Sequence, residues 1–128
     1  MIYILDTDVA ILLRDGDEAI RAGVKALARP LAISVVTRVE LEGGVRRDRS
    51  QSQLRRRLLD VLLATLPVLP FDEAAADAYR LIVEHAGYSR RKLLDRMIAA
   101  QTLVHRAVLV TRNGDDFRDV PGLELLEW

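Results

Sequence analysis

The stretch Ile2-Tyr3-Ile4-Leu5-Asp6 places four apolar residues in a row and ends them with an acid. A short, fully apolar run is typical of a strand buried on both faces of a parallel sheet. A segment whose apolar residues have helical spacing follows this run. Further short apolar runs alternate with such helical segments along the chain. These runs predict strands at residues 31–36, 68–69, 107–111 and 123–126. The alternation favours a three-layer α/β/α sandwich with a mainly parallel sheet of about five strands.

The segments between the apolar runs predict helices. They are expected at residues 9–14, at 17–28, from 37 onward, at 52–66, at 73–86 and within 90–106. No repeat or linker divides the 128 residues, so we expect a single domain over residues 1–128. Thr7 or Asp8 is the expected cap of the first helix, which would leave Asp6 free.

The helix after the second strand has a recognisable start signal. Thr37 and Glu40 have the spacing of a capping box, in which the two side chains satisfy each other's backbone N–H groups. We therefore expect the helix to begin at Thr37. Gly43-Gly44 is expected to weaken or end it, because glycine is a poor helix former.

Four acidic side chains lie where an α/β chain places its active site. Asp6 ends the first strand, and Glu40 lies at the start of the helix after the second. Asp95 lies near the start of the last helix, and Asp116 follows the fourth strand. Because the carboxyl ends of parallel strands share one edge, we expect these acids to converge. Converging carboxylates take up protons or hold a cation, and hard oxygen ligands suit Mg²⁺, or Mn²⁺, rather than Zn²⁺.

The overall charge is balanced, but its distribution is uneven. Nineteen basic residues match nineteen acidic ones, and the chain has no cysteine, which excludes disulfides and thiolate metal sites. No signal peptide or apolar run of bilayer length is visible, so a cytoplasmic location is expected. The arginines cluster, and such clusters are usually solvated helix faces. Their density makes Arg46, Arg47 and Arg49 candidate contacts for the phosphates of RNA.

Several stretches together resemble a known family. The chain is similar to the PIN-domain ribonucleases, and most closely to the VapC-type toxins of bacterial toxin–antitoxin pairs. The similarity covers essentially the whole chain. The stretches with the resemblance are Tyr3–Val9, Ser34–Leu41, Leu94–Ala100, Leu109–Phe117 and the tail from Val120 to Trp128.

The resemblance implies a Mg²⁺-dependent endoribonuclease that hydrolyses RNA and is inhibited by a cognate VapB-type antitoxin. It assigns catalytic and metal-binding roles to the four acids named above: Asp6, Glu40, Asp95 and Asp116. Family members differ over which acid of the last loop is used, so Asp115 stays an alternative. An amide ligand at Asn113 and a supporting hydrogen bond from Thr111 also stay open. Arg96 departs from the small residue usual in the family, and is expected to pair with a site carboxylate or to face solvent.

Two other readings compete with a nuclease. Asp6-Thr7-Asp8 has the spacing of a haloacid-dehalogenase-like phosphatase, with Asp6 as nucleophile and Asp8 as acid and base. Its chemistry requires a lysine near the phosphoryl group, and the two lysines of the chain are poorly placed. It also leaves Glu40 and Asp95 without a role. A signalling receiver domain would instead use Asp72, after a middle strand, although Asp72 is well explained as a helix cap.

The leucine-rich segments hold more apolar surface than one small core readily absorbs. We expect part of this surface to contact another chain. By resemblance it would form a homodimer interface and a groove for the antitoxin. The residues concerned are Leu12, Leu13, Leu54, Leu58, Leu59, Val61, Leu62 and Leu63.

Overall fold

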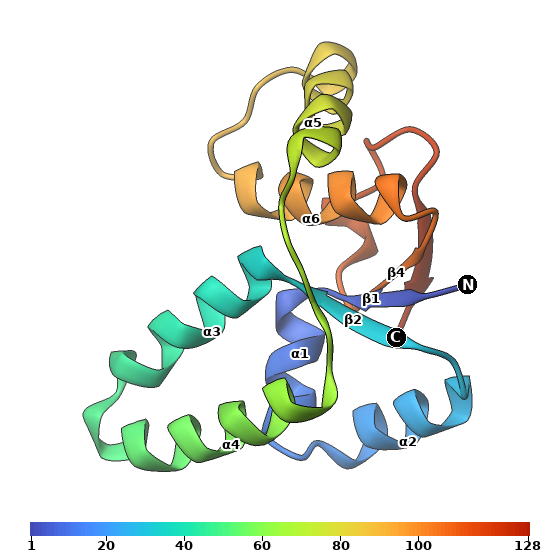
Figure 1. Cartoon of the computed structure of the whole chain (residues 1–128). Coiled ribbons are helices and arrows are strands. Elements are labelled where there is room, and N and C mark those ends of the chain that lie inside the picture. The colour runs from blue at the N-terminus through green and yellow to red at the C-terminus, as the bar shows by residue number, and fades with distance from the viewer.

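A computed structural model of residues 1–128 contains one sheet of five parallel strands in the order β3-β2-β1-β4-β5. Figure 1 shows the sheet between two layers of helices, with α5 and α6 on one side and α1 to α4 on the other. The predicted three-layer α/β/α fold is therefore confirmed. The strands are β1 (Tyr3–Leu5), β2 (Leu31–Ser34), β3 (Val68–Leu69), β4 (Val108–Thr111) and β5 (Glu124–Glu127).

The register of the central strands aligns their carboxyl ends. Leu5 of β1 pairs with Ile33 of β2 on one side and with Val110 of β4 on the other. The next residue along each strand is Asp6, Ser34 or Thr111, and all three are buried. The edge of the sheet where ligands bind in open α/β folds is thus lined by polar side chains.

Six helices cover the sheet, and most agree with the predicted spans. They are α1 (Thr7–Arg14), α2 (Glu18–Leu27), α3 (Val35–Arg47), α4 (Ser52–Thr65), α5 (Glu73–Ala86) and α6 (Leu93–Val104). A short 3₁₀ turn at Gly114–Asp116 follows β4. None of the helices is long and apolar enough to span a bilayer.

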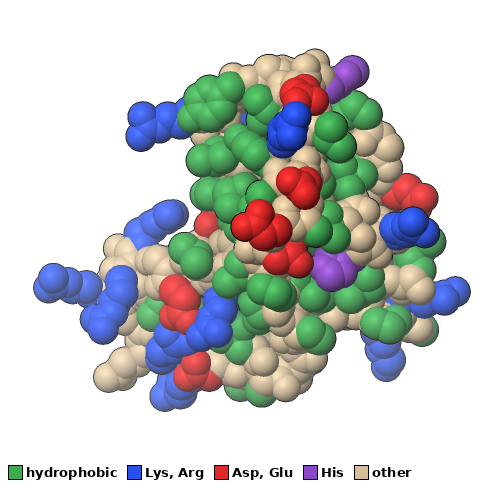
Figure 2. Space-filling view, turned by 45° about the horizontal axis from the view of Figure 1, so that its top comes forward, with side chains coloured by type: hydrophobic (Ala, Val, Ile, Leu, Met, Phe, Trp, Pro, Cys, Tyr) green, Lys and Arg blue, Asp and Glu red, His purple; other side chains and the backbone are tan.

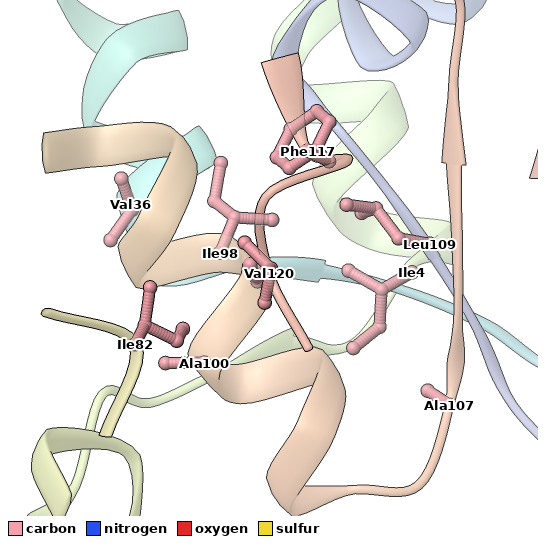
Figure 3. Close-up of a cluster of buried hydrophobic side chains, with 10 residues drawn as sticks. Ile4, Val36, Ile82, Ile98, Ala100, Ala107, Leu109, Phe117 and Val120 are labelled. Carbon is pink, nitrogen blue, oxygen red and sulfur yellow. The ribbon is translucent and has the colours of Figure 1, made fainter. Parts of the chain in front are cut away.

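Two apolar clusters, one on each face of the sheet, hold the layers together. In one cluster, drawn in Figure 3, Ile4 and Leu109 of the sheet pack with Ile98 of α6 and Phe117 of the loop after β4. In the other, Leu5 and its neighbours pack against α1, α3 and α4, and the buried part of α4 is Leu59 and Leu62. Burying both faces explains why the sequence of the central strands is continuously apolar.

The expected start of α3 was wrong. The helix begins at Val35, because Ser34 ends β2 and its hydroxyl accepts a hydrogen bond from the Val36 amide at 2.9 Å. Thr37 is buried inside the helix and so forms no capping box. The glycine pair at 43–44 also lies within the helix, which continues to Arg47. Val45 is buried in the core just beyond that pair, and packing there outweighs the low helix propensity of glycine.

Candidate active site

Asp6 is the most buried acid of the carboxyl edge, with only 5% of its surface exposed. One oxygen, Oδ1, accepts a hydrogen bond from the Val9 amide at 3.0 Å, so Asp6 itself is the N-cap of α1. The other, Oδ2, accepts one from the Thr111 hydroxyl at 2.6 Å. The expectation that Thr7 or Asp8 caps this helix was therefore wrong. Burial raises the pKa of Asp6, while these two hydrogen bonds oppose that rise because they favour the charged form.

Glu40 reaches the same edge from the second turn of α3. Its Oε1 accepts a hydrogen bond from the Thr7 hydroxyl at 2.6 Å. Thr7 Oγ1 also lies 3.1 Å from the hydroxyl of Thr37. The start of α1 and the start of α3 are thus tied together by side chains, and this contact orients Glu40 in place of the expected capping box.

Asp95 lies in the first turn of α6, and its electrostatic environment shows that the acids converge. Burial and the charges of Asp116, Asp6, Glu40 and Asp8, in that order, raise its pKa from 3.8 to about 6. Burial is the larger cause, and like charges nearby add to it because they disfavour ionisation, so these carboxylates lie within electrostatic range of Asp95. The four acids singled out in the sequence therefore share one region, and Asp8 joins them.

Asp116 and Asp115 face in different directions. The charge of Asp116 contributes to the raised pKa of both Asp6 and Asp95, which places it beside the other acids. The side chain of Asp115 is 92% exposed and pairs with Arg118 at 3.0 Å. Of the two acids in this turn, Asp116 is the one turned toward the shared region.

Asn113 and Asp8 are exposed residues at the border of the acidic region. The Asn113 amide nitrogen donates to Asp8 Oδ2 at 3.2 Å, and the Asn113 backbone N–H donates to the Thr111 hydroxyl at 3.0 Å. Asp8, Asn113 and Arg112 line a hollow of about 340 Å³ together with two apolar residues of α1. The sequence predicted Asp8 as a possible helix cap or as the acid and base of the phosphatase alternative, and not as a neighbour of the metal ligands, although its position two residues after Asp6 was a usable signal.

The donor chemistry of the region fits a hard divalent cation. Carboxylate oxygens are the ligands that Mg²⁺ and Mn²⁺ prefer. The pKa of Asp95 is raised first by burial and then by neighbouring negative charge, which a cation would neutralise. With the side chains as they stand, no three acidic or histidine groups are close enough to ligate one ion.

Arg96 matches neither of its two expected environments. It is 2% exposed, and its guanidinium pairs with Asp119 at 2.9 Å rather than with a carboxylate of the shared region. The same guanidinium donates to the backbone carbonyl of Gly87 at 2.6 Å. Burial at this position was not visible in the sequence, because Asp119 lies 23 positions further along the chain.

The arginine cluster lies at the far end of α3. Arg46, Arg47 and Arg49 are all exposed, and Figure 2 shows Lys and Arg side chains gathered over the end of the molecule formed by α3 and α4. Arg46 lines a hollow of about 540 Å³ together with Arg56 and Arg57 of α4. Six residues separate Arg46 from Glu40, which is about 9 Å along a helix axis. The basic surface therefore adjoins the acidic region without entering it.

Comparison with known proteins gives a consistent result. The family model for the PIN domain matches residues 3–123. Ribonuclease VapC2 from Rickettsia felis is 28% identical over 134 residues, which cover 100% of this chain and 98% of the relative. The tRNA(fMet)-specific endonuclease VapC from Shigella flexneri is 28% identical over 139 residues, covering 98% and 97%.

Solved structures show the same arrangement of the chain. VapBC2 from Rickettsia felis, bound to a DNA fragment from its promoter, superposes with a TM-score of 0.86 at 26% identity, over 100% of this chain and 99% of that one. VapBC-1 from nontypeable Haemophilus influenzae gives a TM-score of 0.82 at 26% identity, over 100% and 98%.

Proposed function

Because the chain belongs to the PIN-domain family, we propose that it is a Mg²⁺-dependent endoribonuclease and the toxin of a type II toxin–antitoxin pair. The observation that supports this most strongly is that acids from distant parts of the chain are held at one edge of the sheet, where Thr111 donates to Asp6 and Thr7 donates to Glu40, each at 2.6 Å. The names of its relatives, a ribonuclease and a tRNA-specific endonuclease, support the same assignment.

The proposed metal ligands are Asp6, Glu40, Asp95 and Asp116, with Mn²⁺ able to replace Mg²⁺. Bound there, the cation would supply a Lewis acid that activates water and neutralises charge on the departing oxygen of the phosphodiester. The chain itself holds the ligands in place. Thr111 fixes one oxygen of Asp6 at 2.6 Å, which is the supporting role expected for it.

The residues around the ligands have proposed roles of their own. Thr7 fixes Glu40 at 2.6 Å. The amide nitrogen of Asn113 faces Asp8, which leaves its amide oxygen as the group that could contribute a ligand. Asp115 is the less suitable alternative to Asp116, because it is paired with Arg118 and mostly exposed.

The RNA is proposed to cross from the acidic region to the arginine cluster. Arg46, Arg47 and Arg49 are exposed beside the hollow between α3 and α4, where their charges would attract the phosphate backbone. We expect the protein to act in the cytoplasm, where its RNA substrate is found. The name of one relative, the endonuclease from Shigella flexneri, specifies a transfer RNA as its substrate.

A VapB-type antitoxin and a second copy of the chain are the proposed partners. A hollow of about 560 Å³ between α1, α2 and α4 is lined mainly by apolar residues, among them Leu58, Val61 and Leu66. An apolar helix of an antitoxin would cover such a surface. Large apolar side chains are also exposed elsewhere, including Leu81 and Tyr88, and would suit a homodimer interface. Relatives solved as VapBC complexes support the antitoxin assignment.

The family match and the strand order bear on the two alternative functions, a phosphatase and a receiver domain. The phosphatase reading finds no support in the family match. The receiver-domain reading is wrong, because β3 is an edge strand rather than a middle strand. Asp72, its acceptor, caps α5 through a hydrogen bond from the Ala75 amide at 2.9 Å.

The test is cleavage of total RNA by the purified protein with Mg²⁺ and with EDTA, using Asp6→Asn and Asp8→Asn as matched variants. We expect cleavage only with Mg²⁺, no activity for Asp6→Asn, and a largely active Asp8→Asn. Phosphatase chemistry would instead inactivate both variants and leave a covalent aspartyl-phosphate on the wild type. A wild-type protein that cuts no RNA under any divalent ion would refute the proposal.

A further inference from the structure

Arg96 is a buried cation outside the acidic region, and its hydrogen bonds connect three segments of the chain. Its Nη1 donates to the Gly87 carbonyl at 2.6 Å, in the turn between α5 and α6. Its Nη2 donates to Asp119 Oδ2 at 2.9 Å, in the loop after β4. Lys92 Nζ reaches the same Asp119 oxygen at 3.2 Å. One guanidinium therefore ties the loop and the turn to α6.

The two residues of this ion pair are close in sequence to two of the proposed metal ligands. Arg96 directly follows Asp95 on α6, and Asp119 lies three residues after Asp116. The other side of the same loop is fastened to β5, because the Gly114 amide donates to Glu127 Oε2 at 3.0 Å. The turn that bears Asp116 is thus held between two polar contacts, one to β5 and one to α6.

Stability alone does not account for the pair. Burying the Arg96 guanidinium costs several kcal/mol after relaxation, and its partner Asp119 is only partly buried. An apolar side chain of similar volume often serves a fold as well or better. Here two buried atoms, Arg96 Nε and Asp119 Oδ1, also lack any hydrogen-bond partner. The bonds that Arg96 does make are directional, because its planar guanidinium donates to two separate segments of the chain at once.

We propose that Arg96 and Asp119 are positioning residues, which hold the turn bearing Asp116 at a fixed place beside Asp95 so that both carboxylates can face one cation. This inference rests on the proposed function for its metal. Its structural part, the fixing of the turn, is independent of any metal. Residues that orient metal ligands typically change metal affinity or activity by about 10- to 100-fold when they are replaced.

The test compares Arg96→Met, Asp119→Leu and the double variant with the wild type. Asp119→Leu leaves the buried Arg96 guanidinium without a carboxylate and is expected to be less stable than the double variant, which also removes that charge. Arg96→Met leaves Asp119 partly exposed and still paired with Lys92, so its loss of stability is expected to be smaller. The double variant is expected to bind Mn²⁺ about 10- to 100-fold more weakly by calorimetry, and to lose kcat on RNA while KM stays within about twofold. Arg96→Lys is expected to recover stability more than affinity, because an ammonium does not reproduce the guanidinium fork.

Hydrogen exchange in the metal-free protein gives a readout that does not depend on activity. The amides of Phe117 and Val120, which bond to Gly114 and Phe117 carbonyls at 3.0 and 3.1 Å, are expected to exchange faster in the double variant. Asp119→Asn keeps the shape of the side chain and is expected to show the same direction to a smaller extent. Arg80→Gln, in an exposed pair with Glu84, serves as the control and should change none of these readouts.

The outcomes separate the two proposals. A double variant with wild-type exchange at these amides and wild-type Mn²⁺ affinity overturns the positioning role. A wild type that binds no Mn²⁺ and cuts no RNA overturns the proposed function instead, and the exchange rates then still decide whether the ion pair fixes the turn.

Discussion

Replacing Asp95 with asparagine is expected to make the metal-free protein more stable, and only above about pH 5. The pKa of Asp95 is raised from 3.8 to about 6 by burial and by its acidic neighbours. The folded protein therefore binds this proton more tightly than the unfolded chain does. Stability from this linkage is fully present below about pH 4 and is lost as the pH rises through about 6.

The size of the effect follows from the difference between the two pKa values. At 1.36 kcal/mol for each tenfold change in proton affinity, charging Asp95 destabilises the fold by up to about 3 kcal/mol above pH 7. The asparagine side chain cannot ionise, so Asp95→Asn avoids this cost. The free energy of unfolding of the variant should exceed that of the wild type by up to about 3 kcal/mol at pH 8 and by nothing at pH 3.5. The raised pKa of Asp6 also lowers stability as the pH rises, but it does so in both proteins.

The assay is urea unfolding in EDTA at several pH values between 3.5 and 8. Asp115→Asn is the matched control, because the side chain of Asp115 is 92% exposed and its ion pair with Arg118 is worth little. The free energy of unfolding of this control should equal that of the wild type at every pH. Equal stabilities for wild type and Asp95→Asn at pH 8 would refute the electrostatic account of the acidic region.

Three further predictions concern the metal, Asp6 and the arginine cluster. At pH 7.5, Mn²⁺ at 100 times its Kd is expected to stabilise the protein by about 2.7 kcal/mol, as urea unfolding would show, and no stabilisation would contradict the proposed site. Thr111→Val removes a 2.6 Å hydrogen bond to the buried Asp6 carboxylate, which should cost about 1.5–3 kcal/mol in urea unfolding at neutral pH and raise the pKa of Asp6 further in an NMR titration. An unchanged stability would show that this bond is dispensable. Replacing Arg46, Arg47 and Arg49 with glutamine should raise KM for RNA and lower its salt slope by about 2, at roughly 0.7 per phosphate contact, with kcat unchanged. An unchanged salt slope would place the RNA elsewhere.

The common edge of the strands was predictable because it follows from strand order and direction. Asp6 directly follows a central strand, and parallel strands bring their carboxyl ends to one edge whatever the details of the loops. The place of Glu40 in its helix was predicted wrongly. It was expected at the helix start, but the true start at Val35 puts it in the second turn of α3, where it accepts a hydrogen bond from the Thr7 hydroxyl.

The errors arose where tertiary packing or a local hydrogen bond outweighed propensity. Val35 and Val36 are β-branched and so favoured a longer strand, but the Ser34 hydroxyl caps the helix, which begins two residues earlier than predicted. Gln101 accepts a further hydrogen bond from that hydroxyl and donates to the carbonyls of Leu69 and Pro70, at 3.0 and 2.9 Å. No periodicity in the sequence reports such a contact between α6, β2 and β3.

The Arg96 pair could not be predicted for a related reason. Its partner, Asp119, lies in an irregular loop whose path depends on Phe117 entering the core. The sequence pattern near Asp119 is that of an ordinary polar turn. Side-chain pairs of this kind become visible only when the loop has been placed in three dimensions.

The most direct test of the central claim is an anomalous difference map from a crystal of the wild-type protein soaked in Mn²⁺ at pH 7.5. The account predicts a peak among the carboxylates of Asp6, Asp95 and Asp116, with Glu40 close by, and no such peak in Asp6→Asn. A well-occupied peak elsewhere, or none in the wild type, would contradict it.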